Sequence, residues 1–155
     1  MEWAIEKCTE LGVARIIPVI ARRTDAHLAS SAPRRVERWE RIARQASEQS
    51  RRTTPPQVQQ PLKLKEAVTL TASTRILLAE SGQQLALKDV LRSHAPVNDL
   101  LLAVGPEGGW TDLERGQAEK AGWAPVSAGP TILRAETAAT AALAITLNAW
   151  WPSIH

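Results

Sequence analysis

The sequence contains no tyrosine, no phenylalanine and a single cysteine. RNA-binding surfaces that stack bases on Phe and Tyr are therefore excluded, and six tryptophans supply all the aromatic bulk. One cysteine cannot form an internal disulfide, which fits the reducing cytosol, so we expect a cytoplasmic protein. We interpret Cys8 as a small core residue of a helix, because its helical neighbours are apolar.

Long hydrophobic runs and metal-binding motifs are also missing. No run approaches the length of a transmembrane helix, and residues 1–12 lack the apolar centre of a secretory signal, so we expect no membrane association. The histidines at 27, 94 and 155 stand alone, so we expect no metal site. The length of 155 residues, with 44% hydrophobic and 23% charged residues, is typical of one soluble domain.

The net charge of +3 conceals an uneven distribution of charge along the chain. Residues 15–52 contain ten arginines and only four acidic residues. One interpretation is a solvated helix face, in which Glu37 and Arg41, or Glu40 and Arg44, pair at i,i+4 spacing. The other is a surface that contacts RNA phosphates, for which arginine is well suited. Charge alone does not decide between them.

Periodicity and turn residues predict alternating helices and strands. Gly12 is expected to end a first helix, and Ser31 to cap a second helix that carries Pro33 in its first turn. The inward stripe of that second helix is predicted to be Val36, Trp39, Ala43 and Ala46. Further helices are expected at 62–68, 83–93, 111–122 and 136–151. Strands are expected at 15–20, 74–80, 99–104 and 123–129.

This alternation predicts an α/β fold with a mostly parallel sheet and helices on both faces. Within the 15–20 strand, Pro18 indicates an edge or a bulge. Thr111 and Glu114 form a predicted capping box at the start of the 111–122 helix. Ligands in such folds lie beyond the carboxyl ends of the strands. Glycine-containing loops follow three predicted strands, as VGPEGGW, SAGPTILRAET and the 77–81 strand end with Gly82.

The GPEGG loop at 105–109 holds three glycines and a proline, more than an ordinary strand-to-helix turn requires. We interpret it as a ligand-facing loop and expect a side chain at Gly105 to enter the ligand's space; the alternative is an ordinary turn. The loop lacks the spacing of dinucleotide and P-loop motifs, and Glu107 would repel a phosphate. A ligand with adenine and ribose, recognised mainly by backbone groups, fits better.

Four segments together resemble a known family: IEKCTELGVARIIPV, RWERIARQASEQSRR, LLAVGPEGGW and ILRAETAATAALA. In this order and spacing they are similar to the RsmE-like branch of the SPOUT methyltransferases, from residue 1 to about 150. The resemblance implies methylation of ring nitrogen 3 of a uridine in small-subunit (16S) ribosomal RNA by S-adenosylmethionine. It also implies a homodimer and a C-terminal trefoil knot that holds the cofactor.

Two features depart from the family. Its members usually carry an N-terminal PUA-like β-barrel, which this chain lacks, so we expect one knotted methyltransferase domain over 1–155. Ala128 stands where Leu is usual, and Thr131 where Arg is frequent, so the apolar wall of the cofactor loop is expected to be thinner.

The resemblance also implies roles for individual residues. Arg134 would stabilise negative charge on the base, and Glu136 would accept the imide proton or orient the base; the alternative is an ion pair between the two at the helix start. The implied cofactor contacts are Leu78, Val104, Gly105, Pro106, Glu107, Gly108, Gly109, Ala128, Gly129, Ile132 and Leu133. The RNA side comprises Arg23, Gln49, Arg51 and Arg52 from the resemblance and, from their charge and spacing, Arg34, Arg38 and Arg41.

The last predicted helix is apolar on almost every face, with six alanines between 135 and 144. A helix of that kind is normally buried, and a small domain has little room to bury it alone, so this helix independently predicts a dimer. Two other functions stay open: a related methyltransferase with another RNA target, and an RNA-binding module without catalysis. Only an enzyme requires the cofactor.

Overall fold

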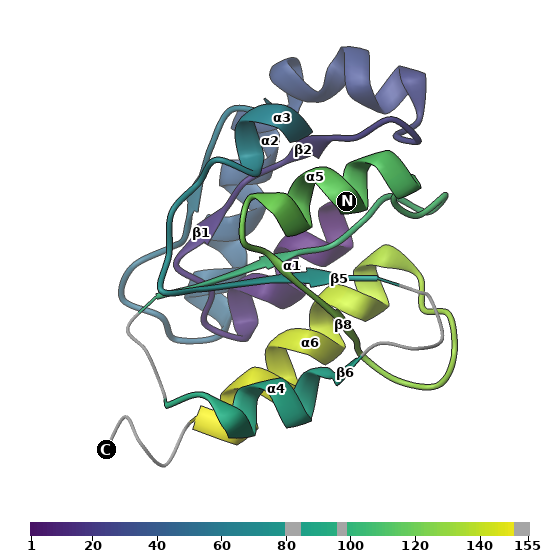
Figure 1. The fold of residues 1–155 in the computed structure, drawn as a ribbon. Coiled ribbons are helices and arrows are strands. Elements are labelled where there is room, and N and C mark those ends of the chain that lie inside the picture. The colour runs from purple at the N-terminus through teal and green to yellow at the C-terminus, as the bar shows by residue number, and fades with distance from the viewer. Residues whose placement is uncertain (80–84, 96–98, 151–155) are drawn as a thin grey trace.

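A computed structural model describes residues 1–79, 85–95 and 99–150 (Figure 1). Its main sheet has four parallel strands in the order β6-β8-β5-β7. These strands are β5 (Thr74–Leu78), β6 (Leu85–Ala86), β7 (Leu100–Ala103) and β8 (Ala124–Ser127). Strand β5 pairs with β7 on one side and with β8 on the other. The predicted parallel α/β fold is confirmed; the trefoil knot stays a prediction.

Helices cover both faces of this sheet, as predicted. Side chains alternate along a strand, so Ile76 and Leu78 of β5 face one side and Leu77 faces the other. The first two pack in a cluster with α4 (Leu87–Ser93) and α6 (Ala135–Trp150). Leu77 packs in a second cluster with α3 (Leu64–Ala67) and α5 (Asp112–Lys120). The sheet is thus the middle layer of the fold (Figure 1).

The N-terminal part forms two small parallel pairs of strands beside the main sheet. Strand β1 (Arg15–Ile16) pairs with β3 (Gln57–Val58), and β2 (Val19–Ile20) pairs with β4 (Leu62–Lys63). The single strand predicted at 15–20 is therefore split in two. Pro18 lies at the break; it has no N–H to donate, but its carbonyl accepts a hydrogen bond from the Leu62 N–H at 2.9 Å.

The predicted start of the second helix was wrong. Helix α2 runs from Ala26 to Gln49, because the Asp25 side chain caps it by accepting the Leu28 N–H at 3.0 Å. Ser31 is therefore buried inside the helix, and Pro33 is an interior residue. Pro33 has no N–H, so the helix lacks one backbone hydrogen bond at that position. A helix of 24 residues that is capped at Asp25 tolerates this loss. The predicted inward stripe is confirmed by the burial of Val36, Trp39, Ala43 and Ala46.

Other boundaries differ less from the predictions. Helix α1 (Glu2–Glu10) ends just before Gly12, which has φ +88°. The predicted capping box of α5 is confirmed, since Thr111 and Glu114 exchange hydrogen bonds. Where a short helix was expected at 62–68, β4 precedes α3, and β6 precedes α4 where the 83–93 helix was expected. The strand predicted at 99–104 is β7, which lies at an edge of the main sheet and is half-buried.

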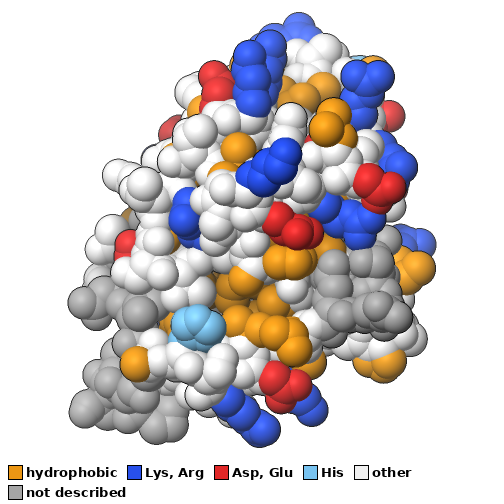
Figure 2. Space-filling model, in the orientation of Figure 1, with side chains coloured by type: hydrophobic (Ala, Val, Ile, Leu, Met, Phe, Trp, Pro, Cys, Tyr) orange, Lys and Arg blue, Asp and Glu red, His pale blue; other side chains and the backbone are white. Residues whose placement is uncertain are grey.

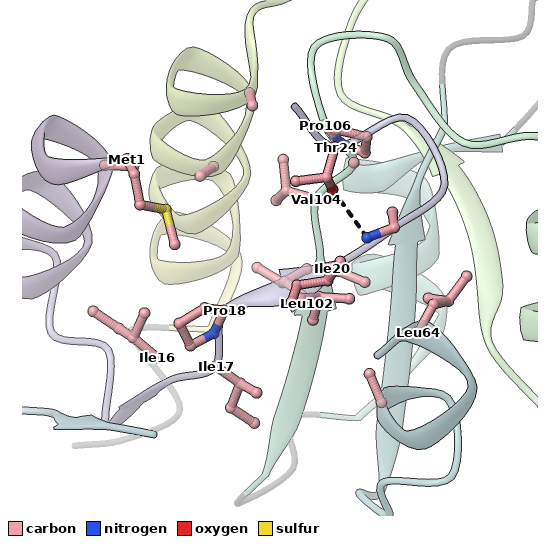
Figure 3. Close-up of a pocket in the computed structure, with 18 of the residues that line it drawn as sticks. Met1, Ile16, Ile17, Pro18, Ile20, Thr24, Leu64, Leu102, Val104 and Pro106 are labelled. Carbon is pink, nitrogen blue, oxygen red and sulfur yellow. Dashed lines mark hydrogen bonds between the residues drawn. The ribbon is translucent and has the colours of Figure 1, made fainter. Parts of the chain in front are cut away.

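An apolar cavity of about 800 Å³ lies beside β7. Figure 3 shows residues that line it, among them Ile16, Ile17, Pro18 and Ile20 from the segment 16–20 and Leu102 and Val104 from β7 and the residue after it. Cys8 also lines it, and burial raises the pKa of its thiol to about 11, which fits its interpretation as a core residue. Within the described residues, no helix is long and apolar enough to span a membrane.

Candidate active site

Three predicted cofactor segments meet at the carboxyl edge of the main sheet. They are the end of β5 at Leu78, the GPEGG loop 105–109 after β7, and the loop 128–134 after β8. Parallel strands bring their carboxyl ends to one edge, and Figure 1 shows the ends of β5 and β8 at the same side of the molecule. Gly82, noted in the sequence, lies outside the described residues.

Trp110 fastens the GPEGG loop to the sheet. Its indole is buried, and Nε1–H donates to the carbonyl oxygen of Leu78 at 2.9 Å. A Cβ placed on Gly105 would lie 3.1 Å from two atoms of that indole, closer than an ordinary contact. A side chain at Gly105 would therefore press on the Trp110 indole; that it would also enter the ligand's space stays a prediction. The bare backbone at Gly105 accommodates Trp110.

The other two glycines of the loop also have internal reasons. A Cβ on Gly108 would lie 3.1 Å from the Cβ of Arg23, whose guanidinium donates to the Gly108 carbonyl at 2.8 Å. Gly109 has φ +72°, a conformation that favours glycine, and its N–H closes a turn on the Pro106 carbonyl at 2.8 Å. The glycines of the GPEGG loop thus make room for other parts of the protein or for the turn of the loop itself.

The loop 128–134 is different, because its surface is open. A Cβ on Gly129 would meet no heavy atom within 4 Å, and Ile132 is 76% exposed. The Ser127 hydroxyl donates to the Gly129 carbonyl at 2.7 Å and holds the start of the loop. Ala128 packs against the core cluster beneath. Loop 128–134 thus presents an exposed apolar side chain and an open glycine; its contact with S-adenosylmethionine stays a prediction.

The predicted catalytic pair lies at the start of α6. Arg134 is exposed, whereas Glu136 is half-buried and lines the 800 Å³ cavity, as Val104 to Gly108 also do. Within the parts of the chain that the structure describes, neither side chain has a hydrogen bond or an ion pair. The alternative of an ion pair at the helix start is therefore not what the structure shows. Both side chains stay accessible to a substrate.

The predicted RNA side is less uniform than its charge indicates. Lys and Arg side chains gather at the end of the molecule where α2 begins and where α3 and α5 lie (Figure 2). Arg34 and Arg41 of α2 are exposed, and Nη2 of Arg41 lies 4.0 Å from Oε1 of Glu37. Arg38, in contrast, donates two hydrogen bonds to the Glu2 carboxylate of α1, from Nε at 2.5 Å and from Nη2 at 3.1 Å. This contact lowers the pKa of Glu2 and raises that of Arg38.

The segment after α2 is divided in the same way. Gln49 and Arg51 are exposed, and Arg51 has the left-handed φ of +59°. The Arg52 guanidinium donates instead to the Thr9 carbonyl in the last turn of α1 at 2.8 Å. Arg23 and Arg52 thus contact the protein's own carbonyl groups as well as presenting positive charge.

Two residues with clear structural roles at this site were missed by sequence reasoning. Trp110 follows the double glycine directly, and a large aromatic residue next to glycines could have indicated that its ring packs against the bare backbone of the loop. Glu114 was recognised as a helix cap only; its carboxylate is buried and also accepts the backbone N–H of Arg22 at 2.6 Å. No sequence pattern announces that second contact. Within the described residues, no group of three or more His, Cys, Asp or Glu side chains could hold a metal ion.

Comparison with solved structures places the whole chain on known folds. A ribosomal RNA small subunit methyltransferase E from Neisseria gonorrhoeae, bound to S-adenosyl methionine, is 37% identical with a TM-score of 0.87, covering 97% of this chain and 61% of that one. A putative methyltransferase from Legionella pneumophila, in complex with the cofactor SAM, is 32% identical with a TM-score of 0.87, covering 96% and 61%.

Curated relatives agree with these structures. Ribosomal RNA small subunit methyltransferase E of Synechocystis is 39% identical over 92% of this chain and 47% of its own length. The protein of that name from Bacillus subtilis is 34% identical over 92% and 59%. The chain thus spans about half to three fifths of these relatives. Residues 1–147 match the family described as RNA methyltransferase domain, and the chain belongs to that family.

Proposed function

We propose that this chain is the catalytic domain of an S-adenosylmethionine-dependent enzyme that methylates ring nitrogen 3 of a uridine in small-subunit ribosomal RNA. The observation that carries the proposal is the open loop 128–134 at the carboxyl edge, in a chain with the fold of a cofactor-bound methyltransferase E. The names of the relatives support the substrate. Such a substrate places the protein in the cytoplasm, as its single cysteine predicts.

The cofactor would be held from two sides. Gly129, Ile132 and Leu133, with Ala128 beneath, offer the open apolar surface. Leu78 and the loop from Val104 to Gly109 supply backbone groups that Trp110 keeps in place. When bound, S-adenosylmethionine supplies the methyl group, and the chain's own residues prepare the base that receives it.

Methylation at ring nitrogen 3 would form an N–C bond while the sulfur–methyl bond of the cofactor breaks and leaves S-adenosylhomocysteine. The N–H bond also breaks, so a group must take the proton. We assign this role to Glu136, or the related role of orienting the base, because it is half-buried and has no partner among the described residues. As the proton leaves, negative charge develops on the two flanking carbonyl oxygens. We assign the stabilisation of that charge to the guanidinium of Arg134, which is exposed.

RNA binding is assigned to the basic face that begins with α2. Arg34, Arg41, Gln49 and Arg51 are exposed and would contact the substrate directly. Arg38 and Arg52 use part of their guanidinium groups within the protein, so their share of the contact is expected to be smaller. Phosphate contacts of this kind give affinity without sequence specificity.

We also propose a homodimer. Only Ala142, Thr146 and Trp150 of α6 are buried within one chain, although the helix is apolar on nearly every face. A second copy would cover the half-exposed apolar remainder. Sedimentation at micromolar concentration is expected to give twice 16.9 kDa; a 16.9 kDa species at every concentration would reject the dimer.

The enzyme is tested by two measurements. Calorimetry with S-adenosylmethionine should show binding by the wild-type chain, and no binding would favour an RNA-binding module without catalysis. Incubation with cofactor and unmodified small ribosomal subunits, followed by nucleoside mass spectrometry, should yield 3-methyluridine. Cofactor binding together with a different methylated nucleoside would show a methyltransferase with another RNA target.

A further inference from the structure

Two hydrogen bonds join the segment before α2 to the GPEGG loop and the helix that follows it. The backbone N–H of Arg22 donates to Glu114 Oε1 at 2.6 Å, and the Arg23 guanidinium donates to the Gly108 carbonyl at 2.8 Å. The partners are 92 and 85 residues apart in sequence. We call this pair of contacts the 22–23 latch.

Glu114 is the buried half of the latch. Its side chain is 7% exposed, and both of its carboxylate oxygens are used: Oε1 by Arg22 and Oε2 by the Thr111 N–H at 2.8 Å. A buried carboxylate that lost one of these donors would be left with an unsatisfied charge, so the contact resists opening. Glu114 thereby fixes the start of α5 against residue 22.

Arg23 is the exposed half of the latch, and both its aliphatic stem and its guanidinium contact the loop. A Cβ on Gly108 would lie 3.1 and 3.3 Å from the Cβ and Cδ of Arg23, so the aliphatic stem already lies against the Gly108 backbone. The guanidinium then reaches the carbonyl of the same residue. The Arg23 side chain therefore holds the loop at Gly108, while Trp110, directly after the loop, holds it to the carbonyl of Leu78.

The segment that carries the latch is itself short and ordered. The Ala21 N–H donates to Thr24 Oγ1 at 2.9 Å, the contact dashed in Figure 3, and Asp25 caps α2 immediately afterwards. The GPEGG loop is consequently tied to the first turn of the basic helix, with no flexible linker between them.

We propose that Arg23 and Glu114 are positioning residues that hold the GPEGG loop in the shape that receives the cofactor. Arg23 then acts on the cofactor side through Gly108, in addition to any contact with RNA phosphate that its charge provides. This inference rests on the proposed function, because it takes the loop to contact S-adenosylmethionine.

A matched pair of variants separates positioning from charge. Arg23→Ala removes the side-chain half of the latch, whereas Arg22→Ala removes an identical charge next to it and keeps the backbone N–H that Glu114 accepts. Arg23→Lys retains one donor and is the conservative variant. Each is compared with wild type in thermal unfolding, in hydrogen exchange of the amides from 105 to 110 without ligand, and in calorimetry with S-adenosylmethionine without RNA.

Arg23→Ala should exchange these amides faster and bind the cofactor roughly three- to tenfold more weakly, with partial recovery in Arg23→Lys and no change in Arg22→Ala. Equal exchange and equal cofactor affinity in Arg23→Ala and Arg22→Ala would overturn the proposal. So would a lower melting temperature for Arg23→Ala with unchanged affinity, since that marks a purely structural contact.

Failure of the wild-type chain to bind S-adenosylmethionine would instead overturn the proposed function and, with it, the cofactor role of the latch. The exchange comparison needs no ligand, so it would still decide whether Arg23 orders the loop. A second variant, Glu114→Gln, keeps the size and one acceptor oxygen. Its amides from 105 to 110 should exchange at a rate between those of wild type and Arg23→Ala; a rate equal to that of wild type would remove Glu114 from the latch.

Discussion

The loops 105–109 and 128–134 both carry glycine at the same edge of the sheet, yet they use it in different ways. In the first, Gly105 lies against Trp110, Gly108 lies against Arg23, and Gly109 takes a left-handed turn. In the second, Gly129 faces open space. Glycine density therefore does not by itself mark the surface that a ligand touches. It marks a place where backbone must come close to something, and the partner is often the protein itself.

Under the proposed function, the two loops would have different roles in cofactor binding. Loop 105–109 is a fixed frame, whose backbone groups are held by Trp110 and Arg23. Loop 128–134 presents open surface at Gly129 and Ile132. Changes in the frame should therefore appear first in stability, and changes in the open loop should appear first in cofactor affinity.

The largest effect is expected from Trp110→Ala, set against Ile132→Ala. Removing the buried indole and its bond to Leu78 should lower the free energy of unfolding by about 3–5 kcal/mol. Ile132→Ala removes an exposed side chain and should change it by less than about 0.5 kcal/mol, while weakening cofactor binding. Urea unfolding and calorimetry measure the two quantities. Similar losses of stability in both variants would break the distinction between frame and open loop.

Arg134→Ala tests whether the last residue of loop 128–134 serves the methyl transfer and not cofactor binding. The single-turnover rate of methylation with saturating RNA should fall by about 10²–10³-fold, because the guanidinium is assigned to charge that develops only in the transition state. Cofactor affinity should stay as in wild type. A normal single-turnover rate would remove Arg134 from the catalytic residues, and a large loss of cofactor affinity would assign it to cofactor binding.

The glycines themselves give a smaller and sharper test. Gly105→Ala should destabilise the chain by about 1–3 kcal/mol, because its Cβ is forced against the Trp110 indole. Gly129→Ala should leave stability nearly unchanged and weaken cofactor binding. Gly116→Ala, in α5 with nothing within 4 Å, is the control and should stabilise by about 0.5–1 kcal/mol. Equal cofactor affinity in Gly129→Ala and Gly116→Ala would exclude Gly129 from the binding surface.

The smallest effect is expected on α2, at residues that belong to neither loop. Charge reversal at Arg34 and Arg41 should flatten the dependence of RNA affinity on salt, each lost phosphate contact lowering the log–log slope by about one. Cofactor affinity should not change, because neither residue touches the latch. Filter binding at several salt concentrations measures the slope. An unchanged slope would show that Arg34 and Arg41 do not contact RNA phosphates and would favour the alternative of a solvated helix face.

Much of the fold could be predicted because its signals are local. The alternation of aliphatic strands and helices predicted a parallel sheet, and the inward stripe of α2 followed from helical spacing. Errors arose where two local signals competed: Ser31 and Pro33 looked like a helix start, but Asp25 capped the helix earlier. Pro18 indicated an interruption, although the separate partners of β1 and β2 could not be inferred from it.

The sequence by itself determined which segments become helices and strands, and which residues could cap or end them, because these preferences act within a few residues of one another. Only the tertiary structure decided what the glycines are for. Trp110 reaches Leu78 across 32 residues, and Arg23 reaches Gly108 across 85. Contacts over such distances exist only after the sheet has brought its strand ends together, so no local pattern encodes them.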